Sequence, residues 1–209
     1  RQARVMLDTA GFPDCQIVAS GSLDENVIRD LLYQGAPIDV FGVGERLITA
    51  QSAPVFGGVY KLAAIETDGA IIPKIKISEN VDKITIPGFK QVWRLFDRES
   101  GKAIADVITL ADEIIDDSRP YAIFDPHFTW KRKTVTNFWA RPLQVKIFAQ
   151  GQCIYQKPPL NQIRDYCAAQ IGTLWDEVLR FENPHAYYVD LSQPLWEMKQ
   201  RLLQEHFAD

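Results

Sequence analysis

Two short apolar runs near the start of this chain each stop at a glycine, and each is followed by a sequence that can begin a helix. The first run ends at Ser20-Gly21-Ser22 and the second at Gly42-Val43-Gly44. Glycine lets the backbone approach an anion closely, and a helix N-terminus presents unpaired N–H groups and the positive end of a dipole. In α/β barrels, such turns in successive βα units hold one phosphate between them. The pair predicts an α/β fold with a site for a phosphorylated ligand, although each turn alone also fits a plain βα connection.

Periodicity divides the chain into three segments. Residues 1–52 alternate helical and extended patterns, as the last βα units of a barrel do. Residues 53–118 change to a period of two with recurring turn signals, which favours β-sheet added outside the barrel. Residues 119–209 mix both patterns, which indicates an α/β C-terminal extension.

Turn and cap residues predict where individual elements begin and end. One helix is expected to end at Gly11. Another is expected to begin with Ser22 as its N-cap, to use Glu25 in a capping box, and to end at Gly35. The sequence Asp68-Gly69 predicts a hairpin. We also expect strands over residues 83–86, 91–96 and 103–110, a hairpin around residues 150–151, and helices over residues 159–180 and 194–206.

Composition and charge restrict the partners of the chain. The formal net charge is −4, which favours neither nucleic acid nor an acidic membrane surface. No apolar run approaches the length that spans a bilayer. Cys15, Cys153 and Cys167 are odd in number and lack metal-ligand spacing, which predicts reduced thiols, no metal site and a cytoplasmic location. The chain begins at Arg1 inside an expected helix and without an initiator Met, so we expect Arg1 to be a boundary within a longer protein.

Several order-dependent motifs along the chain match one enzyme family. They are Ile38 to Gly44, Gly57 to Leu62, Lys76 to Glu79, Lys83 to Gly88, Lys90 to Arg94, Glu182 to His185, and Val189 to Ser192. With these motifs the chain resembles the C-terminal part of nicotinate phosphoribosyltransferase over essentially its whole length. The resemblance implies the C-terminal portion of an irregular phosphoribosyltransferase α/β barrel, with added β-sheet and C-terminal helices.

The resemblance also implies an activity. Members of this family form nicotinate mononucleotide and pyrophosphate from nicotinate and phosphoribosyl pyrophosphate in NAD salvage, assisted by ATP with Mg²⁺. Their catalytic histidine is phosphorylated during the reaction, and none of His127, His185 and His206 lies in a matching context. We therefore expect no catalytic residue in this chain, which alone would be inactive. The groups that hold nicotinate would lie in an N-terminal half of the same protein, and a homodimer is expected from the family.

The family resemblance assigns the 5-phosphate of the substrate to the two glycine turns. The expected phosphate-binding residues are Ser20, Gly21, Ser22, Gly42, Val43 and Gly44. Ser22 and Glu45 depart from the pattern, because many members have an acidic residue and a threonine at these positions. Because a carboxylate would repel the phosphate, we expect the side chain of Glu45 to point away. Arg46 either compensates for Glu45 or pairs with it.

Two further residues are possible parts of this site. Asp39 stands on the second strand, where a carboxylate can bind ribose hydroxyls or Mg²⁺, or can serve a structural hydrogen bond. Lys61 follows Gly57-Gly58 and can either reach an anion or lie on the solvent face of a strand. Two other functions remain open. One is a non-catalytic phosphate-binding or oligomerisation module, and the other is the nicotinamide or quinolinate branch of the same superfamily.

Overall fold

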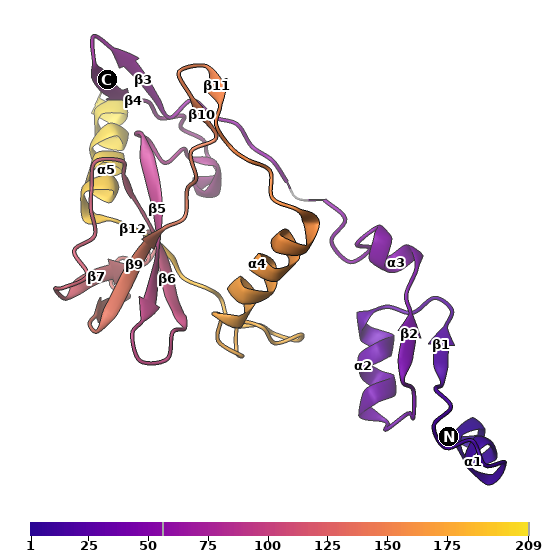
Figure 1. The fold of residues 1–209 in the computed structure, drawn as a ribbon. Helices are drawn as coiled ribbons and strands as arrows, with labels where there is room; N and C mark the ends of the chain where they lie inside the picture. Colours follow the sequence, from indigo (N-terminus) through magenta and orange to yellow (C-terminus); the bar gives the residue numbers. More distant parts are fainter. Residues whose placement is uncertain (56, 209) are drawn as a thin grey trace. The chain divides into compact units, whose positions relative to one another are not determined.

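The computed structural model describes residues 1–55 and 57–208, which form two compact units (Figure 1). The first unit spans Arg1–Tyr60 and the second Lys61–Asp209. Both contain helices and strands, so the chain is mixed α/β, as predicted. Among the described residues, no helix is long and apolar enough to cross a membrane.

The first unit consists of two strands and three helices. Its elements are α1 (Gln2–Thr9), β1 (Val18–Ser20), α2 (Glu25–Tyr33), β2 (Val40–Gly42) and α3 (Glu45–Ile48). β1 and β2 are parallel, in the register that a βα unit requires. Gly11 and Gly35 have φ of +83° and +66° and end α1 and α2 in the left-handed conformation, as predicted.

The predicted start of α2 is wrong by two residues. The side chain of Asp24, not Ser22, caps the helix, and Asp24 Oδ1 accepts a hydrogen bond of 2.9 Å from the N–H of Val27. Gly21 and Ser22 have φ of +112° and +48°, so the chain reverses direction there before the helix begins. Ser22 is therefore part of the turn, and the helix begins later, with Asp24 as its N-cap.

The second unit begins with a hairpin. β3 (Ala64–Thr67) and β4 (Ala70–Pro73) pair about Asp68-Gly69, both with positive φ, as the sequence predicts for a two-residue turn. The strand predicted over residues 83–86 is absent from the described structure. A 3₁₀ turn, η1 (Val81–Lys83), includes residue 83, where the strand was expected to begin. Pro87 follows directly and has no N–H to extend a strand ladder.

A four-stranded sheet carries the centre of the second unit. The strand order is β12 (Val189–Leu191), β6 (Ala103–Leu110), β5 (Lys90–Asp97) and β9 (Phe138–Pro142). β5 is antiparallel to both β6 and β9, and β12 runs parallel to β6. The strands predicted over residues 91–96 and 103–110 are confirmed. Two hairpins accompany the sheet: β7 (Tyr121–Phe124) with β8 (Arg132–Val135), and β10 (Phe148–Ala149) with β11 (Gln152–Cys153).

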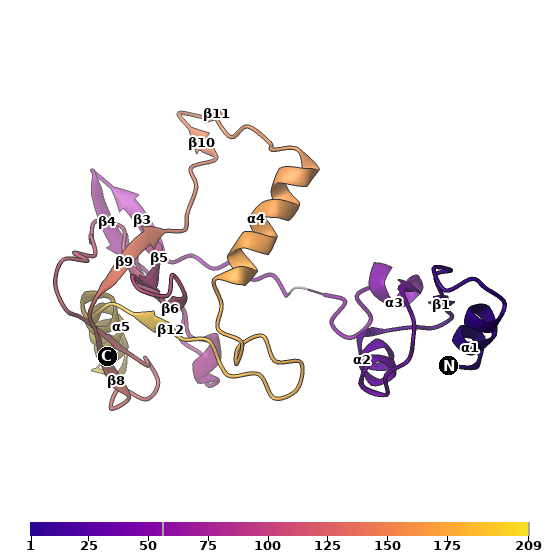
Figure 2. The same cartoon turned by 60° about the horizontal axis from the view of Figure 1, so that its bottom comes forward.

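Two helices complete this unit. α5 (Gln193–Ala208) begins directly after Ser192 and packs against β6, as Figures 1 and 2 show. α4 (Leu160–Gly172) ends well before the predicted residue 180. Lys102, which directly precedes β6, donates from Nζ to the carbonyl oxygens of Gly172 and Leu174, at 3.1 and 2.8 Å. Its ammonium group thereby satisfies carbonyl groups that have no partner inside the helix at the end of α4.

The hydrophobic core lies almost wholly in the second unit. Its buried cluster comprises Leu95, Ala105, Val107, Ile115, Ile123, Val135 and Phe138. Within residues 1–55, Leu23 is the one apolar side chain that is buried. Val18 and Val40, which pair across the two-stranded sheet, remain 64% and 42% exposed. The two units therefore differ in how much of their apolar surface they bury.

Candidate phosphate-binding site

The two glycine turns meet at one edge of the parallel strands. Ser20 and Gly42 are direct partners in the β1–β2 register, so the loops that follow them leave the sheet side by side. A hollow of about 260 Å³ lies between these loops. It is lined by Gly21, Ser22 and Leu23 from the first loop, and by Gly42, Gly44, Glu45 and Arg46 from the second. The structure thus brings together most of the predicted phosphate-binding residues.

Gly42 is required by close packing inside this edge. A Cβ atom built on Gly42 would lie 3.1 Å from the Cβ atom of Ser20, which is tighter than most such contacts, so Ser20 would have to move by a few tenths of an ångström. Gly21 needs its glycine for another reason, because its φ of +112° lies in a region that other residues rarely adopt. The two glycines therefore set both the distance between the loops and the path of the first loop.

Backbone N–H groups point to an anion as the natural occupant. Within residues 1–55, the N–H groups of Ser22 and Leu23 donate to no acceptor of the chain. Glu45 and Arg46 form the first turn of α3, where N–H groups have no partner inside the helix. Clusters of free N–H groups in turns bind anions by their oriented dipoles. The hollow is therefore chemically suited to a phosphate group.

One ion pair joins the two loops. Arg46 Nη1 contacts Asp24 Oδ2, and the two side chains are 36% and 19% exposed. Hydrogen bonding from the Val27 N–H, and then the Arg46 guanidinium, hold the pKa of Asp24 below its usual value. Arg46 was expected either to compensate for Glu45 or to pair with it. In the structure its ion pair is with Asp24. The sequence analysis did not identify Asp24 as the N-cap of α2. The available signal was an aspartate, a preferred N-cap residue, directly before Glu25-Asn26-Val27.

The other candidates lie elsewhere. Asp39 Oδ2 accepts a 2.7 Å hydrogen bond from the N–H of Ile17, at the opposite end of β2 from the hollow, which is the structural role. Lys61 belongs to the second unit, where its Nζ donates to the Lys83 carbonyl oxygen at 2.5 Å. Ser20 and Val43 flank the hollow in sequence but do not line it.

The histidines take no part in this hollow. The backbone N–H of His127 donates to Asp125 Oδ1, and the ring of His185 lies against that of Tyr188, with centroids 6.1 Å apart. His206 lies in α5. In the part of the chain that the structure describes, no three His, Cys, Asp or Glu side chains are grouped as they would be around a metal ion. None of the three histidines therefore lines the hollow.

Known proteins share this sequence and fold. Residues 89–199 match the family model described as the nicotinate phosphoribosyltransferase C-terminal domain. The nicotinate phosphoribosyltransferase of Bacillus subtilis (strain 168) is 43% identical over 205 residues, which are 98% of this chain and 42% of that protein. That of Dictyostelium discoideum is 36% identical over 194 residues, which cover 89% of this chain and 32% of that protein.

A solved structure agrees with the sequence relatives. The crystal structure of human nicotinic acid phosphoribosyltransferase superposes with a TM-score of 0.68 at 25% identity, over 96% of this chain and 36% of that chain. The chain therefore spans less than half the length of these relatives.

Proposed function

The chain belongs to the nicotinate phosphoribosyltransferase family, and on this basis we propose that it is the C-terminal part of an enzyme that forms nicotinate mononucleotide and pyrophosphate from nicotinate and phosphoribosyl pyrophosphate. The observation that carries the proposal is the hollow between the β1 and β2 turns, with its free N–H groups. A phosphate group fits these donors, and both the substrate and the product carry one on the ribose.

The contribution of this chain to the reaction is positioning. The N–H groups of Ser22, Leu23, Glu45 and Arg46 would hold the 5-phosphate, which takes no part in bond breaking. As pyrophosphate leaves, positive character develops at the anomeric carbon, and a fixed phosphate keeps this carbon aligned with the nicotinate nitrogen. Binding energy from a remote group thereby lowers the barrier at the reacting centre.

Other parts of the proposal rest on the family. ATP, with Mg²⁺, would supply the driving force for synthesis, and no residue of this chain is assigned to either. The catalytic histidine and the groups that hold nicotinate would lie in a preceding half of the protein. The complete protein would act as a homodimer. Cys15, Cys153 and Cys167 are all free thiols, which supports a cytoplasmic setting.

Gly42→Val in the complete reading frame tests the phosphate site. The branched side chain meets Ser20 and spreads the two loops, so we expect the apparent KM for phosphoribosyl pyrophosphate to rise at least tenfold, while the KM for nicotinate changes little. Gly172→Val is the matched control, because a Cβ atom there has no neighbour within 4 Å. A folded Gly42→Val enzyme with an unchanged KM for phosphoribosyl pyrophosphate would remove these turns from the site.

A further inference from the structure

A second hollow, of about 290 Å³, lies in the second unit. Its residues come from the β7–β8 hairpin on one side and from β6 and the β12 segment on the other. The hairpin register pairs Ile123 with Lys133, and the β12–β6 register pairs Asp190 with Val107. The hollow shares Ile104, Lys133 and Tyr188 with a neighbouring one of about 440 Å³. Together they reach the size of pockets that hold small organic ligands.

Asp190 is the unexplained group in this hollow. Its residue is only 4% exposed and lines the hollow, and among the described residues its carboxylate has no hydrogen-bond donor. Burial, and then the neighbouring charge of Asp125, raise the pKa of Asp190 to about 6. Its oxygens are not among the fully buried side-chain atoms without a partner, which in the described residues belong to Thr85, Trp93 and Trp196, so they open onto the hollow. The carboxylate therefore faces a space from which a ligand can donate hydrogen bonds.

Basic side chains stand at the mouth of the same hollow. Lys131, Arg132 and Lys133 are all exposed and all line it. The Arg132 guanidinium lies 4.8 Å from the ring centroid of Phe124, and its Nε donates to the Thr129 carbonyl oxygen at 2.9 Å. An arginine has five N–H donors, so the fixed guanidinium keeps donors for an anionic group.

The walls between these charges are apolar and aromatic. Ile104 and Ile123 form the apolar lining, and the Tyr188 side chain is 51% exposed between the two hollows. An exposed tyrosine ring offers a surface on which a nucleobase can stack. The hollow thus combines a hydrogen-bond acceptor, a stacking surface and an anion-binding rim.

From this combination we propose that the hollow around Asp190 binds a mononucleotide. The ribose hydroxyls would donate to the Asp190 carboxylate, as ribose hydroxyls do to acidic residues in dinucleotide-binding folds. The base would lie against Tyr188, and the phosphate would meet Arg132 and the two lysines. A bare metal ion fits less well, because three cations line the hollow beside its two carboxylates, Asp125 and Asp190. A free phosphate fits less well, because Asp190 would repel it.

Calorimetric titration of the full-length protein with adenosine 5′-monophosphate tests this proposal. We expect binding to weaken at least tenfold in Asp190→Asn and to stay unchanged in Asp165→Asn, whose side chain is 70% exposed on α4. The 2′,3′-dideoxy analogue should bind the wild-type protein at least tenfold more weakly, and this comparison decides the matter if Asp190→Asn does not fold. Absence of binding, or equal binding of the nucleotide and its dideoxy analogue, would overturn the proposal.

The two sites are told apart by one further variant. Gly42→Val should raise the KM for phosphoribosyl pyrophosphate but leave the nucleotide titration unchanged, because Gly42 belongs to the first unit and Asp190 to the second. Asp190→Asn should weaken binding in the nucleotide titration but leave the KM for phosphoribosyl pyrophosphate unchanged. Loss of the nucleotide titration in Gly42→Val would place the nucleotide at the phosphate turns and overturn the second site. Loss of turnover alone would bear only on the first.

Discussion

The two units of this chain carry sites of different kinds. In Arg1–Tyr60 the candidate phosphate site is built from backbone N–H groups and glycines, beside almost no buried core. In Lys61–Asp209 a packed core holds a buried carboxylate against a hollow. A backbone site needs only the right turn conformations, whereas a carboxylate with a raised pKa needs neighbouring atoms that displace part of its water. The comparison suggests that the first unit depends on further chain for its stability, because two-stranded parallel sheets are marginal and are normally covered on both faces.

The largest expected effect comes from separating the units. Residues 61–209 alone should unfold in one cooperative transition, because they contain the buried cluster. Residues 1–60 alone should show no such transition, since within residues 1–55 Leu23 is the one buried apolar side chain and the others are half-buried or exposed. Circular dichroism during urea titration measures both, and a cooperative transition in residues 1–60 would break the comparison.

Two leucines sharpen the comparison at single residues. Leu95 is fully buried and Leu47 is 68% exposed. Leu95→Ala should lower the free energy of unfolding by about 3 kcal/mol, because it leaves a cavity in the core. Leu47→Ala should change it by less than about 0.5 kcal/mol in the same protein. Equal losses in chemical denaturation would mean that other parts of the protein bury Leu47 as deeply as Leu95.

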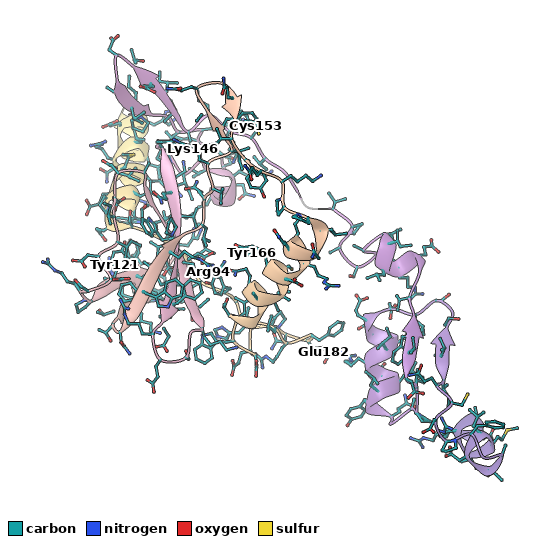
Figure 3. The ribbon with its side chains drawn as sticks, viewed as in Figure 1. Arg94, Tyr121, Lys146, Cys153, Tyr166 and Glu182 are labelled. Carbon is teal, nitrogen blue, oxygen red and sulfur yellow. The ribbon has the colours of Figure 1, made fainter. Side chains whose placement is uncertain are left out.

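Breaking an ion pair should cost more free energy of unfolding in the second unit than in the first. Arg94, which Figure 3 labels, lies in the second unit. It contacts both carboxylate oxygens of Asp106, at 2.7 and 2.9 Å, and the Tyr187 hydroxyl donates to Asp106 Oδ1 at 2.9 Å. Asp106→Asn should cost about 2 kcal/mol, because it leaves a half-buried guanidinium poorly paired. Asp24→Asn should cost well under about 1 kcal/mol, since asparagine also caps helices. Thermal denaturation of both variants measures the difference.

The smallest expected effect is a pH dependence. The pKa of Asp190 is about 6 in the folded protein, above the value of about 3.9 expected for an unfolded chain. The folded state therefore binds more protons, and the stabilisation is present below about pH 4 and lost as pH rises through 6. Asp190→Asn should remove about 1–2 kcal/mol of this pH dependence between pH 4 and 7. Identical pH profiles of the variant and the wild-type protein would contradict the raised pKa.

Local signals predicted much of the fold. Asp68-Gly69 defined a hairpin, and the alternation on both sides of Ser100-Gly101 predicted β5 and β6 closely. Gly11 and Gly35 marked two helix ends correctly. The failed predictions had local and distant causes: Pro87 and the Gly21-Ser22 turn are local, whereas other features depend on residues remote in sequence. At the end of α4, Lys102, which is remote in sequence, donates to the Gly172 carbonyl oxygen, and β12, for which no strand was predicted, is a three-residue strand that pairs with β6.

The same distinction applies to the sites. The glycine turns could be predicted because each is a local pattern, and the β1–β2 register brings them together. The segments at 1–52, 53–118 and 119–209 remain a prediction about how the chain is assembled. Asp190 lies in the Val189 to Ser192 motif, but nothing in the sequence marked it as part of a site. It stands as one acid within a short apolar strand, and only the fold places it beside Asp125 and the β7–β8 hairpin.

Product formation tests the central proposal most directly. Labelled nicotinate is incubated with phosphoribosyl pyrophosphate, Mg²⁺ and ATP, in the presence of the complete reading frame or of this chain alone, and nicotinamide serves as the competing substrate. We predict labelled nicotinate mononucleotide from the complete frame only, with no product from nicotinamide. If the folded complete protein forms no mononucleotide from nicotinate, the chain is not part of a nicotinate phosphoribosyltransferase, and only its phosphate-binding turns would still need a function.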